Sequence, residues 1–332
     1  MNNLYFNKNI QLIHKEIQGK LNKTNKIIDA YLNSEIPIIP KLGKYFFKKK
    51  GKQLRPVMCL LSSKMINKNY SNLKTDIYMS AALEFIHAAT LLHDDVIDKG
   101  TIRRGQKSIN EIWNNKFSVL LGDFMFSKSF QLMTQGKSLK AMEHLSEVSS
   151  KISEGEFLQL SNENNVNLKS SEYIKIISLK TAELFGAALK IPAVLTEKNN
   201  KEIDNLYKLG INFGIIFQII DDTLDYFGDK KTGKQIGKDF MEGKVTLPII
   251  LLLKKMSKNN IKKLKEIFTK NIRNQKDFNF TFSQLEKYEI KKDCLFFAKK
   301  YQIKSENILG KYNNKQSKLL KDLLVSSIKR QD

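Results

Sequence analysis

Residues 81–98 read AALEFIHAATLLHDDVID, an apolar stretch that ends in three aspartates. Its apolar residues recur three and four positions apart, the spacing that places them on one face of an α-helix. On that helix Asp94 and Asp98 are one turn apart, so their carboxylates project from the same side. The stretch therefore predicts a buried helix over 73–99 that carries an acidic pair near its end.

A second acidic cluster, DDTLD at 221–225, closes another apolar run. Asp221 and Asp225 repeat the one-turn spacing, with Asp222 beside them. Like charges at this spacing destabilise a helix by roughly a few tenths of a kcal/mol, which a bound cation would offset. Mg²⁺ fits best, because it binds through one or two carboxylates and completes its shell with water and phosphate. The alternative, that each cluster marks an exposed helix end, accounts poorly for two copies.

The fold class follows from the long stretches without proline, which carry apolar residues at helical spacing, while strand signals are nearly absent. We expect an all-α protein, a bundle of long helices around a central cavity. We expect one domain over 1–332, with a motif-bearing core at about 40–250 and further helices at 255–330. The expected helices cover 9–33, 38–49, 55–67, 73–99, 108–113, 116–134, 137–160, 170–190, 199–227, 245–256, 259–269, 282–305 and 309–329.

The composition is that of a globular protein: of the 332 residues, 41% are hydrophobic, enough for a large core. Cys59 and Cys294 are far apart and lack metal-ligand spacing, which indicates no disulfide framework and a reducing cytoplasm. The N-terminus lacks a secretory signal, and no apolar run approaches the roughly 20 residues that span a bilayer. These features predict a soluble, cytoplasmic protein, and contact with a membrane surface stays compatible with them.

The formal net charge of +23 raises the question of nucleic-acid binding. The lysines are spread over the whole length and no nucleic-acid-binding motif appears, so we expect no nucleic-acid partner. Only five of the 57 basic residues are arginine, namely Arg55, Arg103, Arg104, Arg273 and Arg330. Where lysine is the default cation, an arginine indicates a need for its planar, bidentate guanidinium.

Basic residues stand close to the clusters along the chain. Arg103 and Arg104 follow the first cluster and can complement diphosphate oxygens bidentately, although a basic loop in a basic protein is the plainer alternative. Lys52 and Arg55 stand at the start of a helix, where backbone N–H groups also favour an anion. His87 lies two turns before the first cluster on the same face, where a core histidine is the alternative.

Further polar groups accompany the second cluster. Lys180 and Thr181 supply a cation and a hydroxyl, and Gln218 lies one turn before Asp222. Lys234 and a second lysine at 244 flank glycines 233, 237 and 243, in a loop suited to closing over phosphates. The two clusters and these groups together predict a metal and diphosphate site.

These residues resemble the trans-polyprenyl diphosphate synthases, in particular the long-chain octaprenyl, solanesyl and decaprenyl type. The matching segments, in the family's order, are 51–56 (GKQLRP), 87–98 (HAATLLHDDVID), 103–104 (RR), 122–123 (GD), 180–181 (KT), 217–225 (FQIIDDTLD) and 243–248 (GKVTLP). The resemblance implies the isoprenoid-synthase fold, a homodimer, and about three Mg²⁺ ions between the aspartates and an allylic diphosphate. No recognised motif follows about residue 255.

The resemblance also implies a role for each matched residue. The catalytic set would be Asp94, Asp95, Asp98, Lys180, Asp221 and Asp222. The metal would be bound directly by Asp94, Asp98 and Asp221, assisted by Asp95, Asp222 and Asp225. The allylic diphosphate would contact Arg103, Lys180, Thr181, Gln218 and Lys234. Isopentenyl diphosphate, added head-to-tail, would contact Lys52, Arg55, His87 and Arg104.

The length of the product is predicted from Ala89 and Thr90, about one turn before the first cluster. In short-chain members of the family, this region resembles a floor made of bulky aromatic side chains. Small side chains there would let the growing tail pass. We expect a product of about eight isoprene units (octaprenyl, about C40), for a respiratory quinone side chain. Phe124, Phe126 and Phe130 can form a deeper floor, although core packing is the simpler role.

Three alternatives stay open. One is a synthase with a shorter product, farnesyl or geranylgeranyl diphosphate. Another is a cyclising or head-to-head synthase of the same fold, which would need no pocket of Lys52, Arg55 and His87 for isopentenyl diphosphate. The third is a non-catalytic partner subunit of a heteromeric synthase, although intact acidic clusters argue against it.

Overall fold

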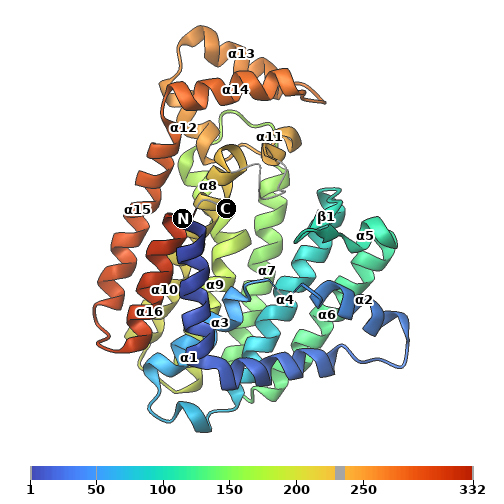
Figure 1. The fold of residues 1–332 in the computed structure, drawn as a ribbon, viewed down its shortest axis with the longest axis vertical. Helices are drawn as coiled ribbons and strands as arrows, with labels where there is room; N and C mark the ends of the chain where they lie inside the picture. Colours follow the sequence, from blue (N-terminus) through green and yellow to red (C-terminus); the bar gives the residue numbers. More distant parts are fainter. Residues whose placement is uncertain (1, 50, 229–235, 331–332) are drawn as a thin grey trace.

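Helices form almost all of the computed structural model, which describes residues 2–49, 51–228 and 236–330 (Figure 1). The N-terminal part comprises α1 (Asn2–Tyr31), α2 (Ile38–Phe47), α3 (Leu54–Ile66), the 3₁₀-helix η1 (Tyr70–Asn72) and α4 (Thr75–Ile97). A short hairpin, β1 (Ile102–Arg103) and β2 (Gln106–Lys107), leads to α5 (Ile109–Ile112), α6 (Asn115–Gln135) and α7 (Leu139–Leu160).

The elements that follow α7 are also helices. They are α8 (Ser170–Ile177), the π-helix η2 (Ser178–Ala182), α9 (Glu183–Leu195), α10 (Asn200–Phe227) and α11 (Lys238–Glu242). The C-terminal helices are α12 (Leu247–Lys255), α13 (Lys258–Phe268), α14 (Gln275–Lys287), α15 (Ile290–Leu309) and α16 (Lys315–Ile328). The prediction of an all-α protein is confirmed.

The predicted helix over 282–305 is wrong, because the structure has two helices there. α14 ends at Lys287 and α15 begins at Ile290, after Glu289 adopts the left-handed conformation with φ 53°. Leu285 and Ile290 are both fully buried, so the chain turns to bring both into the core. No glycine or proline marks this break in the sequence.

Two short elements and several boundaries also differ from the prediction. α1 begins at Asn2 instead of residue 9, and α16 begins only at Lys315, after the capping residue Asn314. The hairpin pairs Ile102 with Lys107 in an antiparallel register, where no strand was expected. The short helix α11 lies where the sequence predicted a loop.

The helices that end in the acidic clusters lie within the bundle. α4 packs along α6 and against α3, and α10 packs between α9 and α15. Gly210 lets α9 approach α10 closely, because a Cβ there would lie 2.3 Å from the Phe185 carbonyl oxygen. α9 also packs against α4, so it links the two helices that carry the clusters.

The N-terminal helix α1 and the C-terminal helix α16 lie side by side (Figure 1). α1 packs against α16, and the Asn9 amide donates to the Asp322 carbonyl at 3.1 Å. Within the described residues, no helix combines the length and the apolar character needed to cross a bilayer.

Candidate active site

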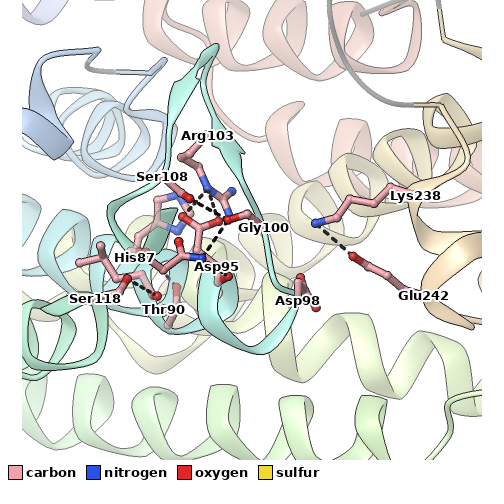
Figure 2. A network of polar contacts seen from close by, with 12 residues as sticks. His87, Thr90, Asp95, Asp98, Gly100, Arg103, Ser108, Ser118, Lys238 and Glu242 are labelled. Atoms are coloured by element: carbon pink, nitrogen blue, oxygen red, sulfur yellow. Dashed lines mark hydrogen bonds and ion pairs between the residues drawn. The ribbon is translucent and has the colours of Figure 1, made fainter. Parts of the chain in front are cut away.

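Asp95, in the first cluster, faces the chain that follows α4. Its buried carboxylate accepts hydrogen bonds from Arg103 Nε at 3.0 Å and Nη2 at 2.5 Å (Figure 2). Its backbone carbonyl accepts from the Gly100 N–H at 2.8 Å, where the helix has ended. Arg103 thereby holds the hairpin over the end of α4.

Asp94 and Asp98 have cations on other elements as neighbours. Asp98 accepts a hydrogen bond from Lys244 Nζ at 2.9 Å. Burial opposes its ionisation, but Lys244 and Lys180 bring the pKa of Asp98 below its ordinary value. Burial raises the pKa of Asp94 to about 6, with Lys180 opposing the rise and Glu156 adding to it. Asp94 is therefore more easily protonated than an ordinary aspartate, whereas Lys244 favours the ionised form of Asp98.

Asp222, in the second cluster, is buried and satisfied by neutral donors. Tyr173 Oη donates to one carboxylate oxygen at 2.6 Å, and Gln218 Nε2 donates to the other at 2.7 Å. The Thr181 hydroxyl donates to the Gln218 carbonyl oxygen at 2.9 Å. Thr181, Gln218 and Asp222 thus form one chain of hydrogen bonds, which links η2 to α10.

Asp221 contacts Arg330, and Asp225 contacts α11. Arg330 Nη2 lies 3.1 Å from an Asp221 oxygen, and its guanidinium stacks 4.6 Å from the Phe217 ring. Asp225 accepts from the backbone N–H groups of Lys238 and Asp239, both at 3.2 Å. Burial and the nearby Asp239 carboxylate raise the pKa of Asp225.

Lys244 contacts the first cluster and the short helix α11. Besides Asp98, its ammonium contacts Glu242 at 2.9 Å. Although burial opposes the charge, Asp239, Asp98 and Glu242 raise the pKa of Lys244 above its ordinary value. Figure 2 shows Asp98 on the side of α4 that faces Lys238 and Glu242 of α11. The segment from α11 to Lys244 therefore places charged side chains between the ends of α4 and α10.

Lys180 reaches this region from the π-helix η2. Its ammonium pairs with Glu156 of α7 at 2.5 Å. Gly155 permits the approach of the two elements, because a Cβ there would lie 2.5 Å from the Lys180 backbone nitrogen. π-Turns of this kind are frequent at functional sites.

A second basic group gathers near His87. Burial lowers the pKa of His87 well below its ordinary value, and the positive charges of Arg55, Arg104 and Arg103 add to the effect. The Arg55 guanidinium lies 4.4 Å from the Phe185 ring, and its Nε is buried without a partner among the described residues. Such a group of cations around a neutral imidazole favours an anionic ligand.

Arg104 and Lys52 border this group. Arg104 donates to the Lys49 carbonyl at 3.1 Å and lies against Gly51, where a Cβ would meet its guanidinium at 2.9 Å. Lys52 Nζ lies 4.4 Å from the ring of Phe6, which also has the Arg330 guanidinium 5.9 Å away. The N-terminal helix and the C-terminal arginine therefore meet beside the predicted isopentenyl diphosphate residues.

The residues of the clusters fit Mg²⁺ by the chemistry of their donors. They offer carboxylate oxygens alone, as a hard divalent cation prefers. No three His, Cys, Asp or Glu side chains in the described part of the chain form a cage that could hold a metal by themselves. This agrees with Mg²⁺, which shares its shell with water and substrate phosphates and seldom occupies an all-protein site.

Several contacting residues were missed by the sequence reasoning, namely Glu156, Tyr173, Asp239 and Arg330. The scarcity of arginine was a signal that could have found Arg330. Nothing in the spacing marks the other three. Lys234, predicted to contact the allylic diphosphate, lies outside the described residues.

The two predicted chain-length residues lie within α4. Ala89 is buried, and the Thr90 hydroxyl donates to the His87 carbonyl at 2.9 Å. Figure 2 places Thr90 beside His87, below the end of the helix. Neither residue carries a bulky side chain that would fill the space beneath the first cluster.

Comparison with known proteins decides the family. The model of the Polyprenyl synthetase family matches residues 36–285. The chain belongs to the polyprenyl synthetase family. It is an enzyme of the prenyltransferase class, and the resemblance inferred from the motifs is confirmed.

Individual relatives agree. The octaprenyl diphosphate synthase of Escherichia coli K12 is 39% identical over 243 residues, which cover 73% of this chain and 74% of that protein. A decaprenyl diphosphate synthase from Rhodobacter capsulatus superposes with a TM-score of 0.91 at 31% identity, covering 97% of this chain and 99% of that one. A polyprenyl synthase from Caulobacter crescentus CB15, solved with calcium and isoprenyl diphosphate, superposes with a TM-score of 0.92 at 33% identity. The match covers 97% of this chain and 98% of that one.

Proposed function

We propose that the protein is a magnesium-dependent trans-polyprenyl diphosphate synthase that adds isopentenyl diphosphate head-to-tail to an allylic diphosphate. The observation that carries the proposal is the pairing of two sites. Acidic clusters lie at the ends of α4 and α10, and Arg55, whose Nε is buried, and Arg104 lie near enough to His87 to lower its pKa. A synthase with a single diphosphate substrate would need the clusters alone.

The two aspartate clusters would bind the allylic diphosphate through the metal. Asp94, Asp98 and Asp221 would hold Mg²⁺, which supplies electrostatic stabilisation of the departing pyrophosphate. The relative crystallised with calcium and isoprenyl diphosphate supports a divalent cation beside such a substrate. Lys180 and Lys244 add positive charge from η2 and from the segment after α11. Asp95 and Asp222, whose oxygens are engaged by Arg103, Tyr173 and Gln218, orient the clusters.

The basic side takes isopentenyl diphosphate. Lys52, Arg55 and Arg104 provide cations, and His87 provides a neutral imidazole. The guanidinium groups suit a diphosphate because they bind its oxygens in pairs. The buried Nε of Arg55, which has no partner in the part of the chain that the structure describes, is one donor that a ligand can satisfy.

The reaction then needs no side-chain nucleophile. The allylic C–O bond ionises as cations stabilise the pyrophosphate. The double bond of isopentenyl diphosphate attacks the allylic carbocation, and the proton lost afterwards goes to the released pyrophosphate. The apolar side chains of α4 and its neighbours exclude water, which would quench the carbocation.

The proposed product is a long chain of about eight isoprene units, about C40, because the small side chains of Ala89 and Thr90 would let the growing tail pass. The octaprenyl synthase of E. coli, at 39% identity, supports this length. A respiratory quinone is the proposed destination of the chain.

The assembly is proposed to be a homodimer of one-domain subunits. The outer face of α6 exposes Val119, Leu120 and Phe130, which a second copy would cover. The contact of Arg330 with Asp221 supports one domain, because the C-terminal residues complete the second cluster.

The protein is proposed to act in the cytoplasm and to release its product at a membrane surface. α15 exposes Phe296 and Ile303 two turns apart, together with lysines at 299, 300 and 304. Such a face suits an anionic lipid surface.

The test is mass spectrometry of the products from farnesyl and isopentenyl diphosphates with Mg²⁺. We expect a main product near C40 that requires both substrates and the metal. A cyclised or head-to-head product from farnesyl diphosphate alone would refute chain elongation. A purified chain that is inactive by itself would indicate a partner subunit, and a main product of C15 or C20 would indicate a short-chain synthase.

A further inference from the structure

Arg273, between α13 and α14, is held by acceptors from three separate segments. Its Nη1 donates to the Met241 carbonyl at 3.3 Å, and its Nη2 donates to the Phe268 carbonyl at 3.1 Å. The same Nη2 donates to Asn164 Oδ1, in the connection between α7 and α8. The guanidinium also lies 4.9 Å from the Phe268 ring, and the residue is 7% exposed. A lysine ammonium, a single point of charge, could not replace this planar set of donors.

The backbone beside Arg273 is the bend that ends α11. Gly243 has a φ of 84°, in the left-handed region that favours glycine, and its N–H donates to the Phe240 carbonyl. Its carbonyl accepts from the Asn164 N–H at 2.8 Å. A Cβ at this position would lie 2.3 Å from Asn164 Oδ1 and 3.2 Å from Arg273 Nη1. Asn164 and Arg273 therefore close tightly on the Gly243 peptide.

The next residue is Lys244, whose ammonium contacts Asp98 and Glu242. Its backbone N–H donates to the Asp239 carbonyl at 2.9 Å. The direction in which the lysine side chain leaves the backbone is thus set by the bend at Gly243.

We infer that Arg273 is a positioning residue for the allylic diphosphate site, which acts by fixing the bend at Gly243 and hence the place of Lys244. The inference rests on the proposed function, in which Lys244 faces the diphosphate. Arg273 itself lies outside the motifs matched in the sequence. Its retention among so many lysines is explained by three acceptors that one guanidinium satisfies together.

The first experiment compares Arg273→Met with Lys270→Met in the full-length enzyme. Lys270, in the same connection between α13 and α14, pairs with Asp277. Its loss should disturb that connection while the hydrogen bonds of Arg273 stay in place. We expect Arg273→Met to raise KM for farnesyl diphosphate about tenfold, with KM for isopentenyl diphosphate changed less than about twofold. Lys270→Met should leave both within about twofold. Arg273→Lys should resemble Arg273→Met, because one ammonium cannot serve three acceptors.

A double-variant cycle tests the route through Lys244. In a Lys244→Met background, adding Arg273→Met should change KM for farnesyl diphosphate by less than about twofold, because the two residues act as a unit. Asn164→Ala, which removes the side-chain acceptor of Arg273 and keeps the backbone N–H bond to Gly243, should change KM in the same direction as Arg273→Met. Independent and additive effects would overturn the inference, as would wild-type kinetics for a folded Arg273→Met.

Binding of inorganic pyrophosphate with Mg²⁺, measured by calorimetry, provides a readout without turnover. Arg273→Met should lose about tenfold in affinity, and Lys270→Met should lose none. Equal affinity of both variants would overturn the inference. If Arg273→Met does not fold, Arg273→Lys and Asn164→Ala carry the same comparison. A wild-type enzyme that binds pyrophosphate but elongates nothing would refute the proposed function. The binding test would then decide by itself whether Arg273 positions Lys244.

Discussion

The aspartates of each cluster differ in what their side chains contact. Successive residues of a helix point about 100° apart, so neighbouring aspartates reach different surroundings. Asp95 is engaged by Arg103, and Asp222 by Tyr173 and Gln218. Asp98 and Asp221 pair with Lys244 and Arg330. We propose that Asp95 and Asp222 orient the clusters and that Asp98 and Asp221 bind the metal.

The residue that should control product length is Ala89. Replacing Ala89 with Tyr should shorten the product to about four isoprene units or fewer, because the ring would block the proposed path of the tail beneath the first cluster. Mass spectrometry of the products measures this. Ala89→Ser, which keeps the side chain small, serves as the control. Persistence of long products in Ala89→Tyr would mean that the tail runs elsewhere.

A pH prediction concerns His144 of α7, remote from the clusters in the sequence. Burial lowers its pKa to about 3, and the charges of Lys190 and Lys151 add to the effect. Below its ordinary pKa of 6.5, the unfolded chain binds a proton that the folded protein refuses. The free energy of unfolding should therefore fall as pH falls from 6.5 towards 3, by up to about 1.4 kcal/mol per pH unit.

The measurement is urea unfolding of the wild type and of His144→Asn between pH 7 and about pH 5. The variant should lose stability more slowly than the wild type as the solution becomes acidic, since asparagine does not titrate. Parallel curves would show that His144 is protonated equally in both states.

At the scale of elements, close approaches between helices place the cations. η2 brings Lys180 to Glu156 because α7 carries a glycine where the two elements touch. α11 brings two backbone N–H groups to Asp225 and leads to Lys244. The site thus depends on short elements that interrupt or follow the long helices.

Gly155→Ala should displace η2 from α7, because the new Cβ would lie 2.5 Å from the Lys180 nitrogen. We expect a loss of about 1–3 kcal/mol in stability from overpacking and a lower kcat through the shift of Lys180. Unfolding experiments and steady-state kinetics measure both. Gly19→Ala on α1 is the matched control, since nothing lies within 4 Å of its Cβ. It should be neutral or stabilising by up to about 1 kcal/mol. Equal effects of both variants would contradict the prediction.

At the scale of the whole molecule, a buried ion pair ties the N-terminal helix to the bundle. Lys20 of α1 contacts Asp76 of α4 at 2.7 Å, and the Ser63 hydroxyl donates to the same carboxylate at 2.7 Å. Burial raises the pKa of Asp76, and Lys20 and Ser63 oppose the rise. The pair fixes α1, whose Phe6 lies beside Lys52 and Arg330.

Lys20→Met should destabilise the protein by about 3–5 kcal/mol, because it leaves a buried carboxylate without its cation. The loss should be larger at pH 8 than at pH 5, since protonation of Asp76 relieves it. Urea unfolding provides the measurement. Lys23→Met, an exposed position on the same helix, should cost less than about 0.5 kcal/mol. A Lys20→Met protein as stable as Lys23→Met would refute a role for the pair.

The sequence by itself determined the helical class, the family, and the candidate residues of the clusters. These are local properties: apolar spacing selects a helix, and residues one turn apart share a face. The break at Glu289 escaped it, because burial of Leu285 and Ile290 decides that turn and no local signal marks it.

Tertiary structure alone decided which charges meet. Lys244 reaches Asp98 across 146 positions, and Arg330 reaches Asp221 across 109. Arg273 meets Asn164 and Met241 for the same reason. Such contacts form because packed helices bring distant segments together in a medium where an unpaired charge is costly. The spacing of residues along the chain does not predict these contacts. The scarcity of arginine was the one feature of the sequence that pointed to Arg273 and Arg330.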